Sequence, residues 1–185
     1  MKSGNMFFAA LVAATVGIAA GGSAWAGKPF GDKAAVRFAG KLWQSLNQAN
    51  LVGDSTIHTN PYEGQPPHGK VLETLYGKVT VNGRYAPVIV KKNYRGKEVT
   101  TEYVADEPDE FLRSITVMYK REKGYDSADK DWFWVKYAPN GKILKNPKGM
   151  ALAGRVVKGA PKGCIACHQA APGGDFVYNN DRYAK

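Results

Sequence analysis

The stretch Cys164-Ile165-Ala166-Cys167-His168, close to the end of the chain, has the spacing C-x-x-C-H. This spacing is typical of c-type haem attachment, because each thiol can form a thioether with a haem vinyl group. The histidine that follows is then placed to bind the iron, while the protein supplies orientation and electrostatics. The spacing therefore predicts one covalent haem c, held by Cys164 and Cys167, with His168 as the metal ligand.

Two other interpretations of this stretch are weaker. A thioredoxin-type disulfide would leave the histidine unexplained, and no βαβ pattern surrounds the two cysteines. A structural zinc site needs four protein ligands, and the chain offers only His58 and His68 besides the motif, since it contains two cysteines and three histidines.

The first 26 residues have the pattern of a cleavable signal peptide. Lys2 gives a positive start, residues 6–20 are apolar and uncharged, and Ala24-Trp25-Ala26 is an A-x-A cleavage signal. The apolar run is short for a membrane span, although an uncleaved anchor stays open as an alternative. We therefore expect export to the bacterial periplasm, which agrees with haem attachment outside the cytoplasm. Residues 27–185 are predicted to form a single domain.

The positive charge is unevenly distributed. The chain of 185 residues carries a formal net charge of +10, and residues 132–174 contain no Asp or Glu. This acid-free stretch could dock an acidic redox partner such as a soluble cytochrome, or it could be a solvated surface that offsets the haem propionates. An exported haem protein is not expected to bind nucleic acid. The cations of the stretch are Lys136, Lys142, Lys145, Lys148, Arg155, Lys158 and Lys162.

The hydrophobic pattern predicts an α+β domain. Apolar residues recur at helical spacing over residues 32–51, and Gly53 is a plausible terminator. Asn82-Gly83 predicts a type I′ hairpin turn. The sequence therefore predicts a mainly antiparallel sheet with an N-terminal helix and a short C-terminal haem-bearing helix. Alternation of apolar and polar residues predicts strands at 71–81, 88–92, 112–120 and 131–137, and polar composition predicts loops at 106–110 and 122–130.

A second axial ligand to the iron would have to come from upstream. Only 17 residues follow His168, and none of them is Met or His. His58 and His68 lie in the Pro/Gly-rich connection 54–70, and either could be the sixth ligand or simply a surface histidine. Met118 and Met150 are further candidates, with core packing as the alternative for each.

A late C-x-x-C-H motif in a β-rich exported chain resembles the cytochrome P-460 family, which includes cytochrome c′-beta. The resemblance is carried by Val88-Ile89-Val90-Lys91, residues 115–120, residues 131–137, the haem motif and Asp175-Phe176-Val177. It implies a β-sheet domain with a five-coordinate haem that acts on hydroxylamine or nitric oxide. Family members are often dimeric, so a homodimer is expected as well.

The resemblance also implies a role for Lys91. In the members that oxidise hydroxylamine, a lysine at the end of a V-x-V-K strand is joined covalently to the haem edge, and Lys91 stands in that place. Such a bond would alter the macrocycle and thereby the reactivity of the iron. Lys92 would point to the other face of the strand. The alternative is a pair of surface lysines beside a hairpin.

The enzymatic interpretation needs a base, because the oxidation of hydroxylamine releases protons. The hydroxylamine-oxidising members have a carboxylate several residues before the haem motif, where this chain is free of acids. Glu73 is put forward as a catalytic substitute from its position alone. Without a base, the pocket would favour nitric oxide, as in cytochrome c′-beta. A third hypothesis is a simple electron carrier with a six-coordinate iron.

Overall fold

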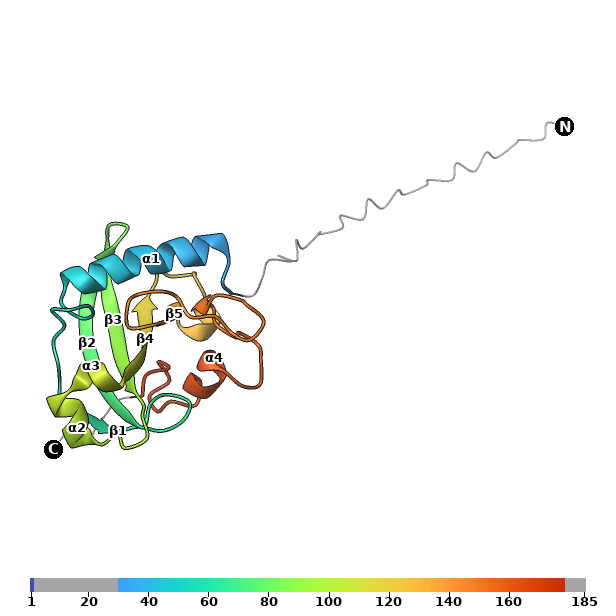
Figure 1. Cartoon of the computed structure of the whole chain (residues 1–185). Helices are drawn as coiled ribbons and strands as arrows, with labels where there is room; N and C mark the ends of the chain where they lie inside the picture. Colours follow the sequence, from blue (N-terminus) through green and yellow to red (C-terminus); the bar gives the residue numbers. More distant parts are fainter. Residues whose placement is uncertain (2–29, 179–185) are drawn as a thin grey trace.

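A single antiparallel sheet forms the centre of the molecule (Figure 1). The computed structural model describes residue 1 and residues 30–178; the predicted signal peptide, apart from its first residue, lies outside the described residues. Six strands follow one another across the sheet in sequence order, with a helix at each end of the described chain. This arrangement confirms the predicted α+β class. Within residues 30–178, no helix is long and apolar enough to cross a membrane.

The four predicted strands are confirmed, but the strand predicted at 88–92 is longer and spans Arg84–Tyr94. Two further strands, each only two residues long, extend the sheet at its edges. They are too short for an alternating pattern to predict them. The strands are β1 (Tyr62–Glu63), β2 (Val71–Val81), β3 (Arg84–Tyr94), β4 (Leu112–Lys120), β5 (Trp132–Tyr137) and β6 (Ala153–Gly154).

The turn between β2 and β3 sets the register of the sheet. Asn82 and Gly83 both have positive φ angles, 52° and 78°, as a type I′ turn requires. Val81 therefore pairs with Arg84, and the same register pairs Glu73 with Lys92 further along the hairpin. Side chains that face each other across strands share a face, so Glu73 and Lys92 lie on one side of the sheet and Lys91 on the other.

Each face of the sheet is covered by its own apolar cluster. On one face, helix α1 (Lys33–Gln48) packs against the alternate residues Ile115, Val117 and Tyr119. On the other face, helix α4 (Cys164–His168) packs against Met118 and its neighbours. Alternate residues of β4 thus pack on opposite faces, and the sheet is a middle layer between α1 and the segment that carries the C-x-x-C-H motif.

Helix α1 begins and ends at recognisable caps. The Asp32 side chain accepts a hydrogen bond from the Ala35 N–H at 2.7 Å. At the other end, Asn50 takes a positive φ of 55°, and the Leu51 N–H bonds back to the Leu46 carbonyl at 2.9 Å. This is a Schellman end with Asn in the left-handed position. The helix therefore stops at Gln48, before the predicted end at residue 51.

Replacement of Asp32 by alanine should lower the free energy of unfolding by about 1 kcal/mol, because the first turn of α1 loses its side-chain acceptor. Urea denaturation followed by circular dichroism would measure the change. Asp54→Ala, which alters an exposed acid in the turn after the helix, is the matched control and should have little effect. Equal stability of the two variants would contradict the capping role.

Short helical segments lie within the two predicted loops and just before the first of them. Helices α2 (Thr101–Asp106) and α3 (Pro108–Phe111) occupy the acidic connection, and a 3₁₀ turn spans Ser127–Asp129. Val104 on α2 is buried against Tyr94 and Val99, which form a small third apolar cluster. Such short helices owe their stability to packing rather than to periodicity, so the sequence pattern alone predicts only a polar loop.

Candidate haem site

The C-x-x-C-H stretch forms the short helix α4, immediately after a glycine that has to be glycine. Gly163 has a φ of 143°, and a Cβ atom there would lie 2.7 Å from the Cβ of Val157. Cys164 is half-buried and Cys167 is exposed, and both thiols are free. Because residues three and four apart are neighbours on a helix, both thiols and the His168 ring lie close together.

The imidazole of His168 is buried and fixed in one orientation. Its Nδ1 lies 2.7 Å from the backbone carbonyl oxygen of Phe176. A carbonyl can only accept, so Nδ1 carries the proton and Nε2 keeps a free lone pair. A histidine that donates through one ring nitrogen to a carbonyl and offers the other is the usual arrangement of a metal-ligating histidine.

Aromatic rings and cations surround this imidazole. Its ring centre lies 4.8 Å from that of Trp134 and 5.4 Å from that of Tyr178, both in edge-on contact. The Tyr178 hydroxyl also donates to the Cys167 carbonyl at 2.9 Å, which ties the following segment to α4. Burial lowers the pKa of His168; the hydrogen bond to Phe176 opposes this shift, and the charge of Lys91 adds to it.

Two rows of side chains cross the sheet beneath α4. One row is apolar and the next is polar, with a lysine on either side of a threonine. The apolar row consists of Ile89, Met118 and Trp134, and the polar row consists of Lys91, Thr116 and Lys136. Burial lowers the pKa of Lys91 and of Lys136, and the charge of Arg95 lowers the pKa of Lys136 further. The structure therefore brings Lys91 to the same face as His168.

A second histidine lies beside the first. The ring centres of His68 and His168 are 6.2 Å apart, with an angle of 81° between the ring planes. The Nδ1 of His68 lies 3.1 Å from the Oδ1 of Asn93, a residue of β3 that is 1% exposed. Burial lowers the pKa of His68 to about 4, and the charge of Lys91 acts in the same direction. At neutral pH the His68 imidazole is therefore uncharged.

Glu73 lies on the opposite face of the sheet, and the structure does not bring it together with His168. Its carboxylate is 1% exposed, accepts hydrogen bonds from the Tyr94 hydroxyl and from the Thr59 N–H, and pairs with Lys92 at 3.4 Å. His58 contacts the same carboxylate at 3.2 Å. The structure therefore does not support Glu73 as a base beside the iron, because the register of the β2–β3 hairpin places its side chain on the face of the sheet that α1 covers.

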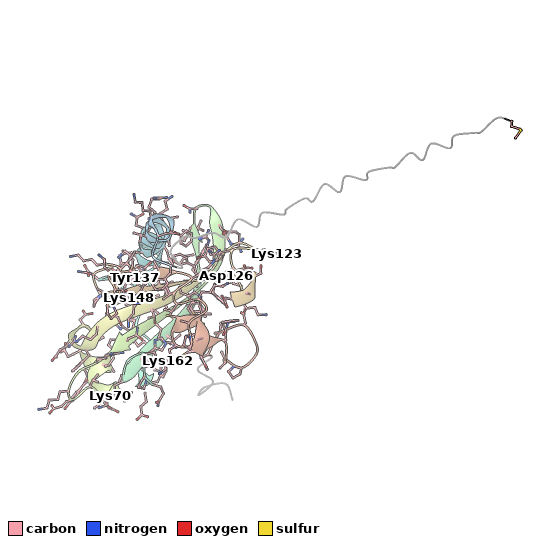
Figure 2. All side chains as sticks on the ribbon, turned by 90° about the vertical axis from the view of Figure 1, so that its right-hand side faces the viewer. Lys70, Lys123, Asp126, Tyr137, Lys148 and Lys162 are labelled. Carbon is pink, nitrogen blue, oxygen red and sulfur yellow. The ribbon has the colours of Figure 1, made fainter. Side chains whose placement is uncertain are left out.

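Some cations of the acid-free stretch form ion pairs with acids in the loop between β4 and β5. Lys158 forms ion pairs with Asp126 and Asp129, and the side chain of Gln169, directly after α4, donates to Asp129 at 3.2 Å. These contacts hold the loop before α4 to the loop between β4 and β5. They were not evident from the sequence. Figure 2 draws the side chains as sticks and labels Lys148, Lys162 and Asp126 among them. Within the part of the chain that the structure describes, the exposed lysines of the stretch that form no ion pair are Lys142, Lys145, Lys148 and Lys162.

The residues of this face fit a haem. Two thiols and a histidine with a free Nε2 come from one short helix, and buried apolar side chains lie beneath it. The indole N–H of Trp134 is buried and has no hydrogen-bond partner among the described residues. A buried donor of this kind is normally satisfied, and a polar group of a bound cofactor would satisfy it. Met118 and Met150 both contribute to the apolar cluster here.

Comparison with known protein families supports the same conclusion. Residues 83–179, just over half of the chain, match the family described as Cytochrome P460. The matched segment contains Lys91, the apolar and polar rows from β3 to β5, and the whole of α4. Searches of curated proteins and of solved structures found no match. The chain belongs to the cytochrome P460 family of haem cytochromes.

Proposed function

We propose that this protein is an exported, periplasmic cytochrome that binds nitric oxide at a single haem c. Cys164 and Cys167 would hold the haem covalently, and His168 would bind the iron through Nε2. The bound haem supplies an iron that can take a small ligand and exchange one electron. An acidic soluble cytochrome would be the redox partner, drawn to the exposed lysines before α4.

The observation that carries this proposal is the set of groups around His168. They are the aromatic rings of Trp134 and Tyr178, the neutral imidazole of His68 and the partly buried cation of Lys91. Glu73, the acid considered for proton transfer, lies on the other face. Nitric oxide is small and neutral and needs no proton transfer in order to bind, so such surroundings suit it better than a substrate that must lose protons.

Titration of the dithionite-reduced protein with nitric oxide tests the proposal. The visible spectrum should convert to that of a ferrous nitrosyl haem at about one nitric oxide per haem. The haem content should be measured on the same sample by the pyridine haemochrome method. A fully haem-loaded protein that gives no nitrosyl spectrum would refute the proposal.

Hydroxylamine oxidation is the second candidate function, and the position of Lys91 favours it. The Lys91 amine lies on the face of His168, and burial lowers its pKa, which makes the neutral, nucleophilic form more accessible. If the amine is bonded to a haem edge carbon, as the family resemblance implies, an N–H and a C–H bond have been replaced and an external two-electron oxidant has been consumed, and the haem has a third attachment. In this candidate, electrons from hydroxylamine would leave one at a time to the partner cytochrome.

Lys91→Ala decides between the two candidates. If the amine is bonded to the haem, the wild-type ferrous Soret band should be strongly red-shifted, and both Lys91→Ala and Lys91→Arg should return it to the position of an ordinary c-type haem. Lys136→Ala, in the same row of the sheet two strands away, is the matched control and should keep the wild-type band. An ordinary Soret band in the wild type would remove the cross-link and, with it, the support for hydroxylamine oxidation.

A further inference from the structure

The indole N–H of Trp134 is a buried hydrogen-bond donor that lacks an acceptor. The residue is 3% exposed, and its Nε1 atom has no hydrogen-bond partner among the described residues. The side chains beside it in the apolar row, Ile89 and Met118, offer no oxygen or nitrogen atom. Buried donors in native proteins are nearly always satisfied, because an unsatisfied one loses its hydrogen bond to water without a replacement. An acceptor from outside residues 30–178 is therefore expected here.

The other tryptophan of β5 shows that this vacancy is specific to Trp134. Trp132 lies two residues earlier on the same face, and its indole N–H donates to the carbonyl oxygen of Asp175 at 2.9 Å. Both tryptophans belong to the same apolar cluster and are equally buried, at 3% exposure. The donor without an acceptor belongs to the tryptophan whose ring centre lies 4.8 Å from that of His168.

The same strand also carries a cation without a counter-ion. Lys136 follows Trp134 by two residues, so both side chains lie on the face that α4 covers. Lys136 is half-buried and interacts with no acid in the described part of the chain, while burial and the charge of Arg95 lower its pKa. The ammonium group also acts on the charge state of the Cys164 thiol, which places it close to α4. Charges removed from water are normally paired, so Lys136 calls for an anion.

One carboxylate would satisfy both groups, because it accepts hydrogen bonds and carries a negative charge, whereas a water molecule supplies only the acceptor. A haem offers such groups at its edge. Its methyl groups are apolar and its vinyl groups become thioethers, so the polar atoms of its edge are those of the two propionates. Trp134 contacts the ring of His168, so this strand lies beside the histidine that would bind the iron.

We propose that the indole N–H of Trp134 and the ammonium group of Lys136 together bind one propionate of the haem. The inference rests on the haem c of the proposed function, and it gives a role to two residues that bind neither the iron nor the thioether carbons. Reduction of the iron adds an electron near the negative propionate, and the charge of Lys136 offsets that repulsion. The pair therefore raises the reduction potential of the iron.

Redox titration of the haem-loaded protein measures this effect. Lys136→Gln should shift the ferric–ferrous equilibrium about tenfold toward the ferric state, which for one electron is a fall of about 59 mV in the potential. Lys136→Arg keeps the charge and should stay close to the wild type. Lys142→Gln removes an exposed lysine and is the matched control, with little effect expected because water and salt screen its charge. An unchanged potential in Lys136→Gln would overturn the proposal.

Infrared difference spectra between the oxidised and reduced protein identify the carboxylate. Haem made from δ-aminolevulinic acid with a heavy carbon isotope in its carboxyl group carries that isotope in both propionates, so their bands can be told from those of Asp and Glu. Trp134→Phe and Lys136→Gln should each shift an isotope-sensitive carboxylate band. Trp132→Phe, which loses an N–H that already has a protein acceptor, should not. A response confined to bands without the isotope would assign the two groups to a carboxylate of another source and refute the proposal.

The Soret band distinguishes this electrostatic role from a structural one. Propionates lie outside the conjugated ring, so the band should keep its position in the Lys136 variants, and a displaced band in Lys136→Gln would count against the proposal. If Trp134→Phe fails to retain haem because its ring packs against His168, the Lys136 variants still decide. The proposed function has its own criterion, because a wild-type protein that fails to bind nitric oxide refutes that function and leaves the potentials of the variants unaffected.

Discussion

A variant in which Cys164 and Cys167 are both replaced by serine should carry no covalently bound haem. The chain contains only these two cysteines, and a serine hydroxyl does not form the thioether that a thiol makes with a vinyl group. Both side chains lie on α4 with free thiols; Cys167 is exposed, and Cys164 is half-buried at the edge of the apolar cluster, where a serine of similar size leaves little space. The apoprotein should therefore keep its fold. Peroxidase staining of a denaturing gel and intact mass spectrometry would measure the loss.

The single variants Cys164→Ser and Cys167→Ser are the controls, and each should retain haem through one remaining thioether. Haem that stays attached to the double variant after extraction with acidic acetone would contradict attachment through the motif alone. In that case, adding Lys91→Ala to the double variant would show whether the lysine holds the haem, because Lys91 lies on the same face as His168.

The sheet could be predicted from the sequence because its signals are local. Apolar alternation over residues 112–120 and 131–137 defines the strands and their two faces, and Asn82-Gly83 defines the turn. The edge strands β1 and β6 and the helices α2 and α3 could not be predicted in this way. They are too short to show a period, and their stability comes from contacts with distant residues.

Only those site residues that lie close together in the sequence could be predicted from their spacing. The thiols and His168 lie within five residues, and Lys91 was placed by family resemblance. The hydrogen bond between His68 and Asn93 joins residues that are 25 positions apart in the sequence. No periodic pattern in the sequence could predict this contact. The position of Glu73 was within reach of the sequence. A two-residue turn at 82–83 pairs residue 81 with 84 and so 73 with 92, which puts Glu73 on the face of Lys92 and away from Lys91.

That placement leads to a second large effect, on stability. Glu73→Ala should lower the free energy of unfolding by about 3–5 kcal/mol, because the Lys92 ammonium would be left buried without its carboxylate. Lys92 is 1% exposed; burial lowers its pKa, and Glu73 is the main group that opposes this shift. The Tyr94 hydroxyl would lose its acceptor as well. Denaturant unfolding followed by circular dichroism would measure the change, with Glu63→Ala, an exposed acid on β1, as control.

The same variant separates a structural from a catalytic role for Glu73. Because the carboxylate lies in the layer opposite His168, the haem spectrum and nitric oxide binding of folded Glu73→Ala protein should equal those of the wild type. A combined Glu73→Leu and Lys92→Met variant should recover most of the lost stability, since removal of both charges leaves no unpaired ion in the core. A Glu73→Gln variant that kept its stability but altered the chemistry at the iron would contradict the purely structural role. That role is expected because the register between β2 and β3 places Glu73 on the face opposite Lys91.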